Sequence, residues 1–157
     1  MKTIILYATK YGGASEVARL IAALFEGAVT CNLNGDDIAS LDDFECVIIG
    51  SSVYAGSFLN EAKSYLSANA EILCKKKLGI FACGINKSKS NEVFKANVPD
   101  AVLAATTAVC LSGGVFNPER ASFFEKLIIR IVTKQKGAIN NINGENILEF
   151  AEAMKED

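Results

Sequence analysis

The sequence predicts an α/β fold in which helices cover both faces of a doubly wound, five-stranded parallel sheet. Strand-like and helix-like segments alternate along the chain, and this alternation is typical of parallel strands joined by helical crossovers. Two strand-like segments, Val47 to Ile49 and Leu78 to Phe81, are apolar throughout instead of at every second position. We expect both at the centre of the sheet, because only strands covered on both faces bury all of their side chains.

The expected strands are short runs of mainly apolar residues. In chain order they are Thr3 to Ala8, Ala28 to Leu33, Cys46 to Gly50, Leu78 to Ala82 and Thr107 to Leu111. The expected helices instead repeat their apolar residues at intervals of three or four positions, as Val17, Ile21 and Leu24 do, so that these residues share one face. The helices are Glu16 to Glu26, Ser57 to Ala70, a segment that begins near Ser90 and ends before Pro99, Phe123 to Thr133, and Glu145 to Lys155.

The length and composition indicate one ordinary globular domain that spans residues 1–157. Half of the 157 residues are apolar and 22% are charged, which leaves little room for a disordered tail. The net charge of −2 provides no basic field, so nucleic acid is not an expected partner. No apolar segment approaches the roughly 18 residues of a membrane span. We therefore expect a soluble, cytoplasmic protein.

The cysteine and histidine content excludes several kinds of site. The five cysteines are an odd number without a CxxC spacing, so we expect reduced thiols. A metal site is not expected, because four of these scattered thiols would have to converge to hold zinc. The chain contains no histidine, which excludes Ser-His-Asp and Cys-His nucleophilic sites.

The first expected strand leads directly into a turn that is typical of phosphate-binding sites. The turn is rich in glycine and hydroxyl side chains, and it opens the first helix. Exposed backbone N–H groups and the positive end of the helix dipole both point toward an anion in this arrangement. The residues of the turn are Thr9, Lys10, Tyr11, Gly12, Gly13, Ala14 and Ser15.

Two further loops are rich in small and polar residues, and they follow the two central strands. Doubly wound sheets bind ligands beyond the carboxyl ends of their strands, where the strand order reverses. Tyr54 has neighbours too small to cover its ring, which is therefore free to stack on a flat ligand. Alternatively, Tyr54 is an ordinary half-buried loop residue and the serines cap a helix at Ser57. The loops comprise Ser51, Ser52, Val53, Tyr54, Ala55 and Gly56, and Cys83, Gly84, Ile85, Asn86 and Lys87.

Several other phosphate-binding proteins are excluded by motifs that the sequence lacks. There is no GxxxxGK[ST] motif of a triphosphate P-loop and no GxGxxG dinucleotide fingerprint, which excludes kinases and dehydrogenases of those kinds. A phosphate-accepting signalling receiver is expected to have acidic residues after its first strand and an aspartate after its third. This chain has Thr9 and Lys10 at the first place and Ser51 and Ser52 at the second.

The three loops resemble those of the flavodoxin-like family. Residues Thr9 to Gly13 match the family's [ST]-x-x-G-x-T phosphate loop, whereas Ala14 replaces the threonine and Ser15 could supply a substitute hydroxyl. Val47 to Gly56 is similar to the family's third-strand segment. The resemblance implies the strand order 2-1-3-4-5 and noncovalent FMN, with the phosphate in the first loop and the isoalloxazine ring between the other two.

A narrower resemblance extends toward the C-terminus. The segment from Asn117 to Arg130 is similar to the C-terminal region of flavodoxin-like menaquinone-dependent protoporphyrinogen dehydrogenases. This resemblance implies an oxidoreductase that acts on a quinone, a tetrapyrrole or another small molecule, with peripheral membrane contact through Phe123 to Val132. Alternatively, the segment is a helix that packs against the sheet.

We therefore expect an FMN-binding flavoprotein that is an oxidoreductase, in which the flavin carries the redox chemistry and no side chain is catalytic. One alternative is an electron-carrier flavodoxin that serves a redox partner protein. A net charge of −2 is small for the strongly acidic docking surface expected of such a carrier. The other alternative is a non-enzymatic protein of this fold that has lost FMN, which the missing hydroxyl at Ala14 leaves open.

Overall fold

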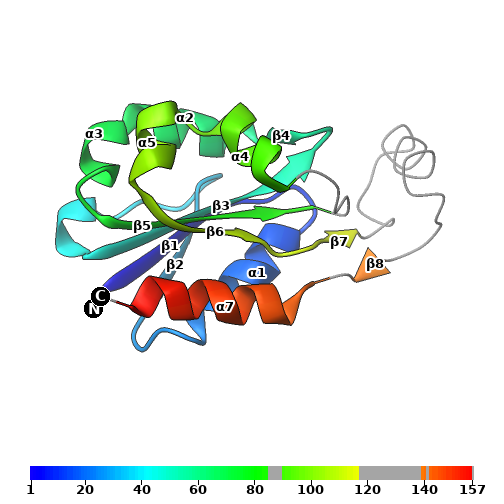
Figure 1. Cartoon of the computed structure of the whole chain (residues 1–157), viewed down its shortest axis with the longest axis horizontal. Helices are drawn as coiled ribbons and strands as arrows, with labels where there is room; N and C mark the ends of the chain where they lie inside the picture. Colours follow the sequence, from blue (N-terminus) through cyan, green and yellow to red (C-terminus); the bar gives the residue numbers. More distant parts are fainter. Residues whose placement is uncertain (85–89, 117–138, 141, 157) are drawn as a thin grey trace.

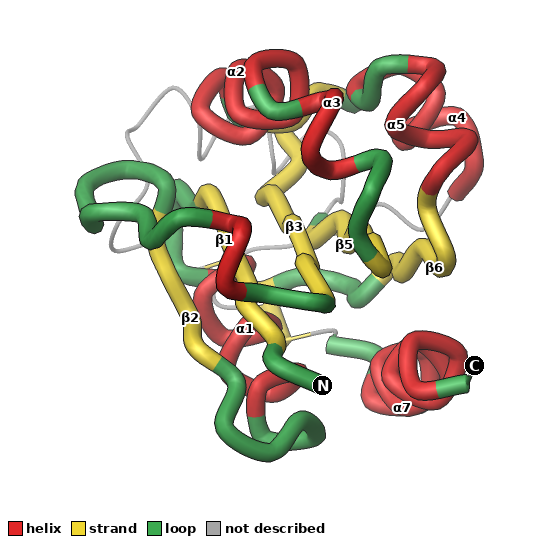
Figure 2. The backbone as a smooth tube through the Cα atoms, turned by 90° about the vertical axis from the view of Figure 1, so that its left-hand side faces the viewer, coloured by secondary structure: helices red, strands yellow, loops and turns green. Residues whose placement is uncertain are grey.

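The computed structural model describes residues 1–84, 90–116, 139–140 and 142–156 of the chain. At its centre lie the parallel strands β1 (Thr3–Ala8), β2 (Val29–Asn32), β3 (Cys46–Tyr54), β5 (Lys77–Cys83) and β6 (Thr106–Leu111). They form a sheet that Figure 1 shows nearly edge-on, and its strand order, β2-β1-β3-β5-β6, runs from left to right in Figure 2. Counted along the chain, these five strands have the order 2-1-3-4-5, so the predicted topology is confirmed.

Helices cover both faces of this sheet, as predicted (Figure 2). One face carries α1 (Gly13–Ala22) and α7 (Gly144–Lys155), and the other carries α2 (Asn60–Ala68), α3 (Ala70–Leu73), α4 (Ser90–Asn97) and α5 (Asp100–Ala105). Neighbouring strand residues point to opposite faces. Ile5 and Ile48 belong to the apolar cluster on the side of α1 and α7, whereas Ile4 and Ile49 belong to the cluster on the other side. None of the helices in the described ranges is long and apolar enough to cross a membrane.

The predicted helix over Ser57 to Ala70 is wrong at its start and its end. Its first two residues form a short strand, β4 (Ser57–Phe58), which pairs antiparallel with β3. The helix α2 then begins at Asn60, and α3 follows it as a separate short helix. The apolar residues Ala62 and Leu66 lie on the buried face of α2, so the predicted spacing is confirmed within the helix.

Several short elements were not predicted. They are the 3₁₀ helix η1 (Leu41–Asp43), the helix α5 directly after Pro99, and the antiparallel pair β7 (Val115–Phe116) and β8 (Ile139–Asn140). Each is too short to show a hydrophobic period of its own. The predicted helix from Phe123 to Thr133 lies outside the described residues.

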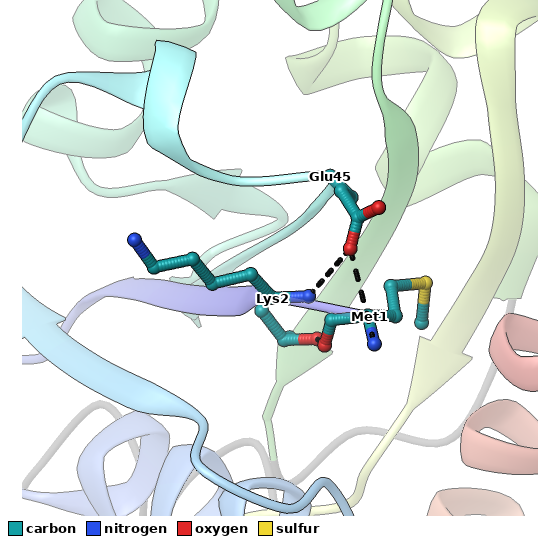
Figure 3. A network of polar contacts seen from close by, with 4 residues as sticks. Met1, Lys2 and Glu45 are labelled. Carbon is teal, nitrogen blue, oxygen red and sulfur yellow. Dashed lines mark hydrogen bonds and ion pairs between the residues drawn. The ribbon is translucent and has the colours of Figure 1, made fainter.

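The amino end of β1 is tied to β3 through Glu45 (Figure 3). Its Oε2 accepts a hydrogen bond of 2.8 Å from the backbone N–H of Lys2 and lies 3.8 Å from the ammonium group of Met1. The Glu45 side chain is 71% exposed, so the ion pair itself stabilises the fold little. These contacts are at the amino ends of the strands, and the predicted loops are therefore at the opposite edge of the sheet.

Candidate functional site

The predicted loops follow β1, β3 and β5, and the carboxyl ends of these parallel strands lie at one edge of the sheet (Figure 1). The chain order of the strands reverses at β1, because β2 lies on one side of β1 and β3 on the other. This is the switch point at which doubly wound sheets bind their ligands. The predicted residues 9–15, 51–56 and 83–84 lie in the described part of the chain, whereas Ile85, Asn86 and Lys87 lie outside it.

The turn after β1 is held in shape by its first residue. Thr9 Oγ1 accepts a hydrogen bond of 3.0 Å from the backbone N–H of Gly12. Gly12 has a φ of 90°, which glycine adopts without a steric penalty, and it is the N-cap of α1. Its carbonyl oxygen accepts the N–H of Glu16 at 3.0 Å. The helix therefore begins at Gly13, earlier than the predicted start at Glu16.

The early start of α1 places Gly13, Ala14 and Ser15 in its first turn. Backbone N–H groups in a first turn have no acceptor within the helix, and they carry the positive end of the helix dipole. These three N–H groups can therefore donate to an anion that lies beyond β1. The Ala14 side chain is fully buried in the apolar cluster that also contains Ile5 and Phe81, while Ser15 is half-buried.

A carboxylate in the first turn of α1 is paired with an arginine. Arg19 Nη2 lies 2.6 Å from Glu16 Oε1, and Arg19 Nε lies 3.1 Å from Glu16 Oε2. These hydrogen bonds hold the pKa of Glu16 below its usual value and raise the pKa of Arg19. The guanidinium group therefore offsets a negative charge that would otherwise repel an anion at this end of the helix.

The loop after β3 is a tight hairpin. β3 extends beyond the predicted end at Gly50 as far as Tyr54, which pairs with Ser57 of β4. Ala55 and Gly56 lie between these two residues, with positive φ values of 49° and 76°. Two successive positive φ values are typical of a type I′ turn, which fits the twist of a hairpin with a two-residue loop. Tyr54 is thus presented at the end of a strand beside a turn of defined geometry.

The serines near this hairpin have structural roles that differ from the alternative of a helix cap at Ser57. Ser51 is fully buried, and its Oγ donates to Ser52 O at 2.8 Å and accepts from the backbone N–H of Leu59 at 2.9 Å. Because Leu59 is the N-cap of α2, the serine that stabilises the start of this helix is Ser51. Ser57 lies in β4, where its Oγ accepts from Lys63 Nζ at 3.1 Å.

Lys10 connects the turn after β1 with the hairpin after β3. Its Nζ lies 5.0 Å from the centroid of the Tyr54 ring and 5.6 Å from the centroid of the Tyr11 ring. Both distances are within the range of cation–π attraction. Lys10 is exposed and Tyr54 is half-buried, so a positive charge and an aromatic ring lie together at the surface of the site.

Gly84 brings the loop after β5 against β3. A Cβ atom on Gly84 would lie only 3.3 Å from Val53 Cβ, a tighter contact than most Cβ atoms make, so the loop lies close against the strand. The Gly84 N–H donates to Gly113 O at 2.9 Å, which ties the loop to the chain after β6. Cys83 is buried in the same apolar cluster as Ala14. The structure thus brings together the described parts of all three predicted loops.

Asn97, the last residue of α4, supports the hairpin and was not predicted as part of the site. Its Oδ1 accepts the backbone N–H of Phe58 at 2.8 Å, and its Nδ2 donates to Gly56 O at 2.9 Å and to Val93 O at 2.7 Å. Asn97 is 8% exposed. A single asparagine at the end of a helix gives no sequence signal for contacts across 39 and 41 positions of the chain.

The site therefore combines backbone N–H donors, a lysine ammonium group and an aromatic ring. The described residues contain no cluster of three or more His, Cys, Asp or Glu side chains that could hold a metal ion. Such a donor set fits a ligand with an anionic phosphate at one end and a flat ring at the other.

Solved structures share this fold at low sequence identity. Oxidised flavodoxin 1 from Bacillus cereus aligns with a TM-score of 0.59 at 16% identity, over 98% of this chain and 97% of that chain. A flavoprotein in complex with FMN from Lactobacillus acidophilus aligns with a TM-score of 0.52 at 13% identity, over 72% of this chain and 92% of that chain. At these identities the similarity shows the fold alone.

A larger protein contains the same fold as one part. Rubredoxin oxygen:oxidoreductase from Desulfovibrio gigas aligns with a TM-score of 0.59 at 15% identity, over 98% of this chain but only 36% of that chain. No curated protein matches the sequence. The family model of the flavodoxin domain matches residues 4–142, a range that includes all three loops of the site. The chain therefore belongs to the flavodoxin domain family.

Proposed function

We propose that this chain binds FMN noncovalently and transfers electrons through it. The observation that carries the proposal is the meeting of the α1 N-terminus and the Tyr54 hairpin at the switch point, where Lys10 Nζ lies 5.0 Å from the Tyr54 ring centroid. FMN joins a phosphate to a flat ring, so its two ends correspond to the two parts of this site. Membership of the flavodoxin domain family and the fold shared with a flavoprotein solved in complex with FMN support the same cofactor.

The phosphate would be held mainly by backbone N–H groups. Those of Gly13, Ala14 and Ser15 lie in the first turn of α1 and have no helical acceptor. Thr9 Oγ1 accepts the Gly12 N–H, and its own proton remains able to bond to a phosphate oxygen. Lys10, Tyr11 and Gly12 complete the predicted phosphate loop, in which Lys10 adds positive charge.

The ring would lie between the hairpin and the loop after β5. Tyr54 would stack on one face of the ring, and the small residues around it would allow the ring to approach the backbone. When bound, FMN supplies the exchange of electrons and protons, so the protein needs only to orient the ring, shield it from water and bond to its polar edge. The remaining predicted residues at the ring are Ser51, Ser52, Val53, Ala55, Gly56, Cys83, Gly84, Ile85, Asn86 and Lys87.

Within this class, an enzyme similar to the menaquinone-dependent protoporphyrinogen dehydrogenases is the first candidate. Its support is the sequence similarity of Asn117 to Arg130, a segment outside the described residues. The second candidate is an electron carrier for a redox partner protein, which is supported by the fold shared with Bacillus cereus flavodoxin over 98% of this chain. For either candidate, the proposal includes a single domain over residues 1–157 that works in the cytoplasm.

Titration with FMN tests the cofactor. The chain is expected to quench FMN fluorescence stoichiometrically and to become yellow. Tyr54→Ala is expected to raise the Kd for FMN about tenfold, because stacking of a flat ring on an aromatic side chain contributes about 1–3 kcal/mol. Tyr54→Phe keeps the ring and is the matched control. If the wild-type chain does not bind FMN, the proposal is refuted. Equal Kd values for Tyr54→Ala and Tyr54→Phe would refute stacking of the flavin ring on Tyr54.

Anaerobic mixing separates the enzyme from the carrier. Protoporphyrinogen mixed with the oxidised, FMN-loaded protein is expected to bleach the flavin absorbance if the chain is a dehydrogenase of this kind. A carrier is expected to be reduced by a reduced ferredoxin and to leave protoporphyrinogen unchanged. Flavin absorbance that is bleached by reduced ferredoxin but not by protoporphyrinogen would therefore favour the second candidate, the electron carrier.

A further inference from the structure

The Tyr54 hairpin has little stability of its own. Its second strand, β4, is two residues long and pairs with β3 at only two positions, Val53 with Phe58 and Tyr54 with Ser57. Ala55 adopts a φ of 49°, a left-handed conformation that is unfavourable for a residue with a Cβ atom. Isolated two-stranded hairpins are marginal in water even when they are longer. Other contacts must therefore fix the position of Tyr54.

Asn97 provides these contacts from α4. Its amide oxygen accepts the Phe58 N–H and its amide nitrogen donates to Gly56 O, so one side chain bonds to the turn and to the strand after it. The third hydrogen bond, from Nδ2 to Val93 O, fixes the side chain to its own helix. Because Asn97 is only 8% exposed, water does not readily replace these bonds.

Aromatic packing supports the same connection. The rings of Phe58 and Phe94 lie edge to face, with centroids 6.3 Å apart and an interplanar angle of 87°. Phe94 is 2% exposed and lies on α4, the helix that carries Asn97. The hairpin is therefore attached to α4 through apolar packing and through a polar group that specifies its position.

We propose that Asn97 is a positioning residue, which holds the Tyr54 hairpin in the geometry that binds the flavin ring. The inference rests on the proposed FMN function. α4 is the first described helix after the β5 loop that is predicted to lie on the ring. Asn97 thus connects the Tyr54 hairpin to α4, the helix that follows the loop after β5. Loss of the Asn97 side chain changes both the overall affinity for FMN and the ratio of the affinities for oxidised and reduced FMN, because Tyr54 is then no longer held in a fixed position beside the flavin ring.

The test compares Asn97→Ala with the matched control Asn69→Ala. Asn69 Nδ2 also donates to a backbone carbonyl, Tyr65 O at 3.0 Å, but it is at the end of α2 and makes no hydrogen bond to the hairpin. In the FMN-free protein, Asn97→Ala is expected to speed amide hydrogen exchange of residues 54–58 about tenfold, since it removes two hydrogen bonds to them. Exchange in β1 is expected to remain as in the wild type.

FMN binding provides the functional readout. Asn97→Ala is expected to raise the Kd for oxidised FMN about fivefold and to change the ratio of the Kd values for oxidised and reduced FMN about threefold. Asn69→Ala is expected to leave both unchanged. If Asn97→Ala does not fold, Asn97→Ser, which keeps a shorter donor and acceptor, is expected to show the same changes to a smaller degree.

The outcomes separate this inference from the proposed function. A wild-type chain that does not bind FMN refutes the proposed function and, with it, a flavin role for Asn97. FMN binding that is identical in wild type and Asn97→Ala refutes the positioning role alone. Exchange that rises equally in all strands also refutes it, because that result indicates a loss of global stability. Adding Ala55→Asn to Asn97→Ala is expected to slow hairpin exchange again, since asparagine tolerates positive φ in a type I′ turn.

Discussion

The substitution Gly50→Ala tests the packing that supports the candidate site. Gly50 lies in β3 directly before Ser51 and pairs in register with Phe81 of β5. A Cβ atom on Gly50 would lie 1.9 Å from Phe81 Cζ, 2.1 Å from Cε1 and 2.2 Å from Cε2. Carbon atoms in contact are about 3.5 Å apart or more, so the ring would have to move by roughly 1.6 Å.

The Phe81 ring can move only by displacing other side chains of the core. It is fully buried in the apolar cluster with Val17, Ile21 and Met154 from α1 and α7. Overpacking of a closed core costs typically 1–3 kcal/mol, and the close approach to an aromatic ring here places the expected cost near the upper end, about 3 kcal/mol. For a domain of this size, this loss corresponds to a Tm lowered by about 9 °C.

Urea denaturation of the purified variants provides the assay. Gly35→Ala is the control, because a Cβ on Gly35 meets nothing within 4 Å and its effect is expected to be small. Combining Gly50→Ala with Phe81→Leu is expected to recover part of the loss, with a coupling free energy of about 1 kcal/mol or more. If Gly50→Ala unfolds at the same urea concentration as Gly35→Ala, the steric argument is refuted.

Three further predictions concern the thiols and the phosphate loop. At pH 8, a thiol reagent is expected to react rapidly only with the exposed Cys74, and Cys74→Ser should abolish the fast phase, whereas urea should expose the other cysteines. Burial raises the pKa of Cys110 from an ordinary 9.0 to about 12. As the pH rises, the Cys110 thiol therefore loses its proton in the unfolded chain before it does so in the folded chain. Relative to Cys110→Ala, the free energy of unfolding is therefore expected to fall by about 1.4 kcal/mol between pH 8 and pH 10. Lys10→Gln is expected to raise the Kd for FMN about threefold at low salt and less at high salt, whereas Lys75→Gln, whose ammonium pairs with Glu71, should have no effect.

The fold could be predicted because its strands carry strong local signals. β1 has the predicted bounds, Thr3–Ala8, and the two segments that are apolar throughout lie in β3 and β5 at the centre of the sheet. Burial on both faces requires this composition, so it can be recognised without any knowledge of the neighbouring strands. The strand order, by contrast, came from the resemblance to a family and was confirmed by the structure.

The errors lie at the ends of elements, where specific backbone pairing and hydrogen bonds override the pattern of apolar residues. The predicted helix begins at Ser57, but pairing with Tyr54 draws Ser57 into β4, and α2 begins at Asn60 after the bond from Leu59 N–H to Ser51 Oγ. The same pairing extends β3 beyond its predicted end at Gly50. A helical spacing of apolar residues predicts that a helix exists, but it does not fix the residue at which the helix begins.

The missing hydroxyl at Ala14 has a physical explanation in the position of that residue. Its side chain is fully buried in the cluster with Ile5 and Phe81, while its backbone N–H lies in the first turn of α1. A side chain at this position can therefore contribute to the core without changing the N–H donors that an anion would meet. Thr9 Oγ1 already fixes the turn after β1 by accepting the Gly12 N–H, so the shape of this turn does not require a second hydroxyl group. Replacing threonine by alanine at this position removes at most one hydrogen bond to the phosphate and leaves the main-chain N–H donors and the helix dipole in place. For this reason Ala14 by itself does not argue that the protein has lost its cofactor.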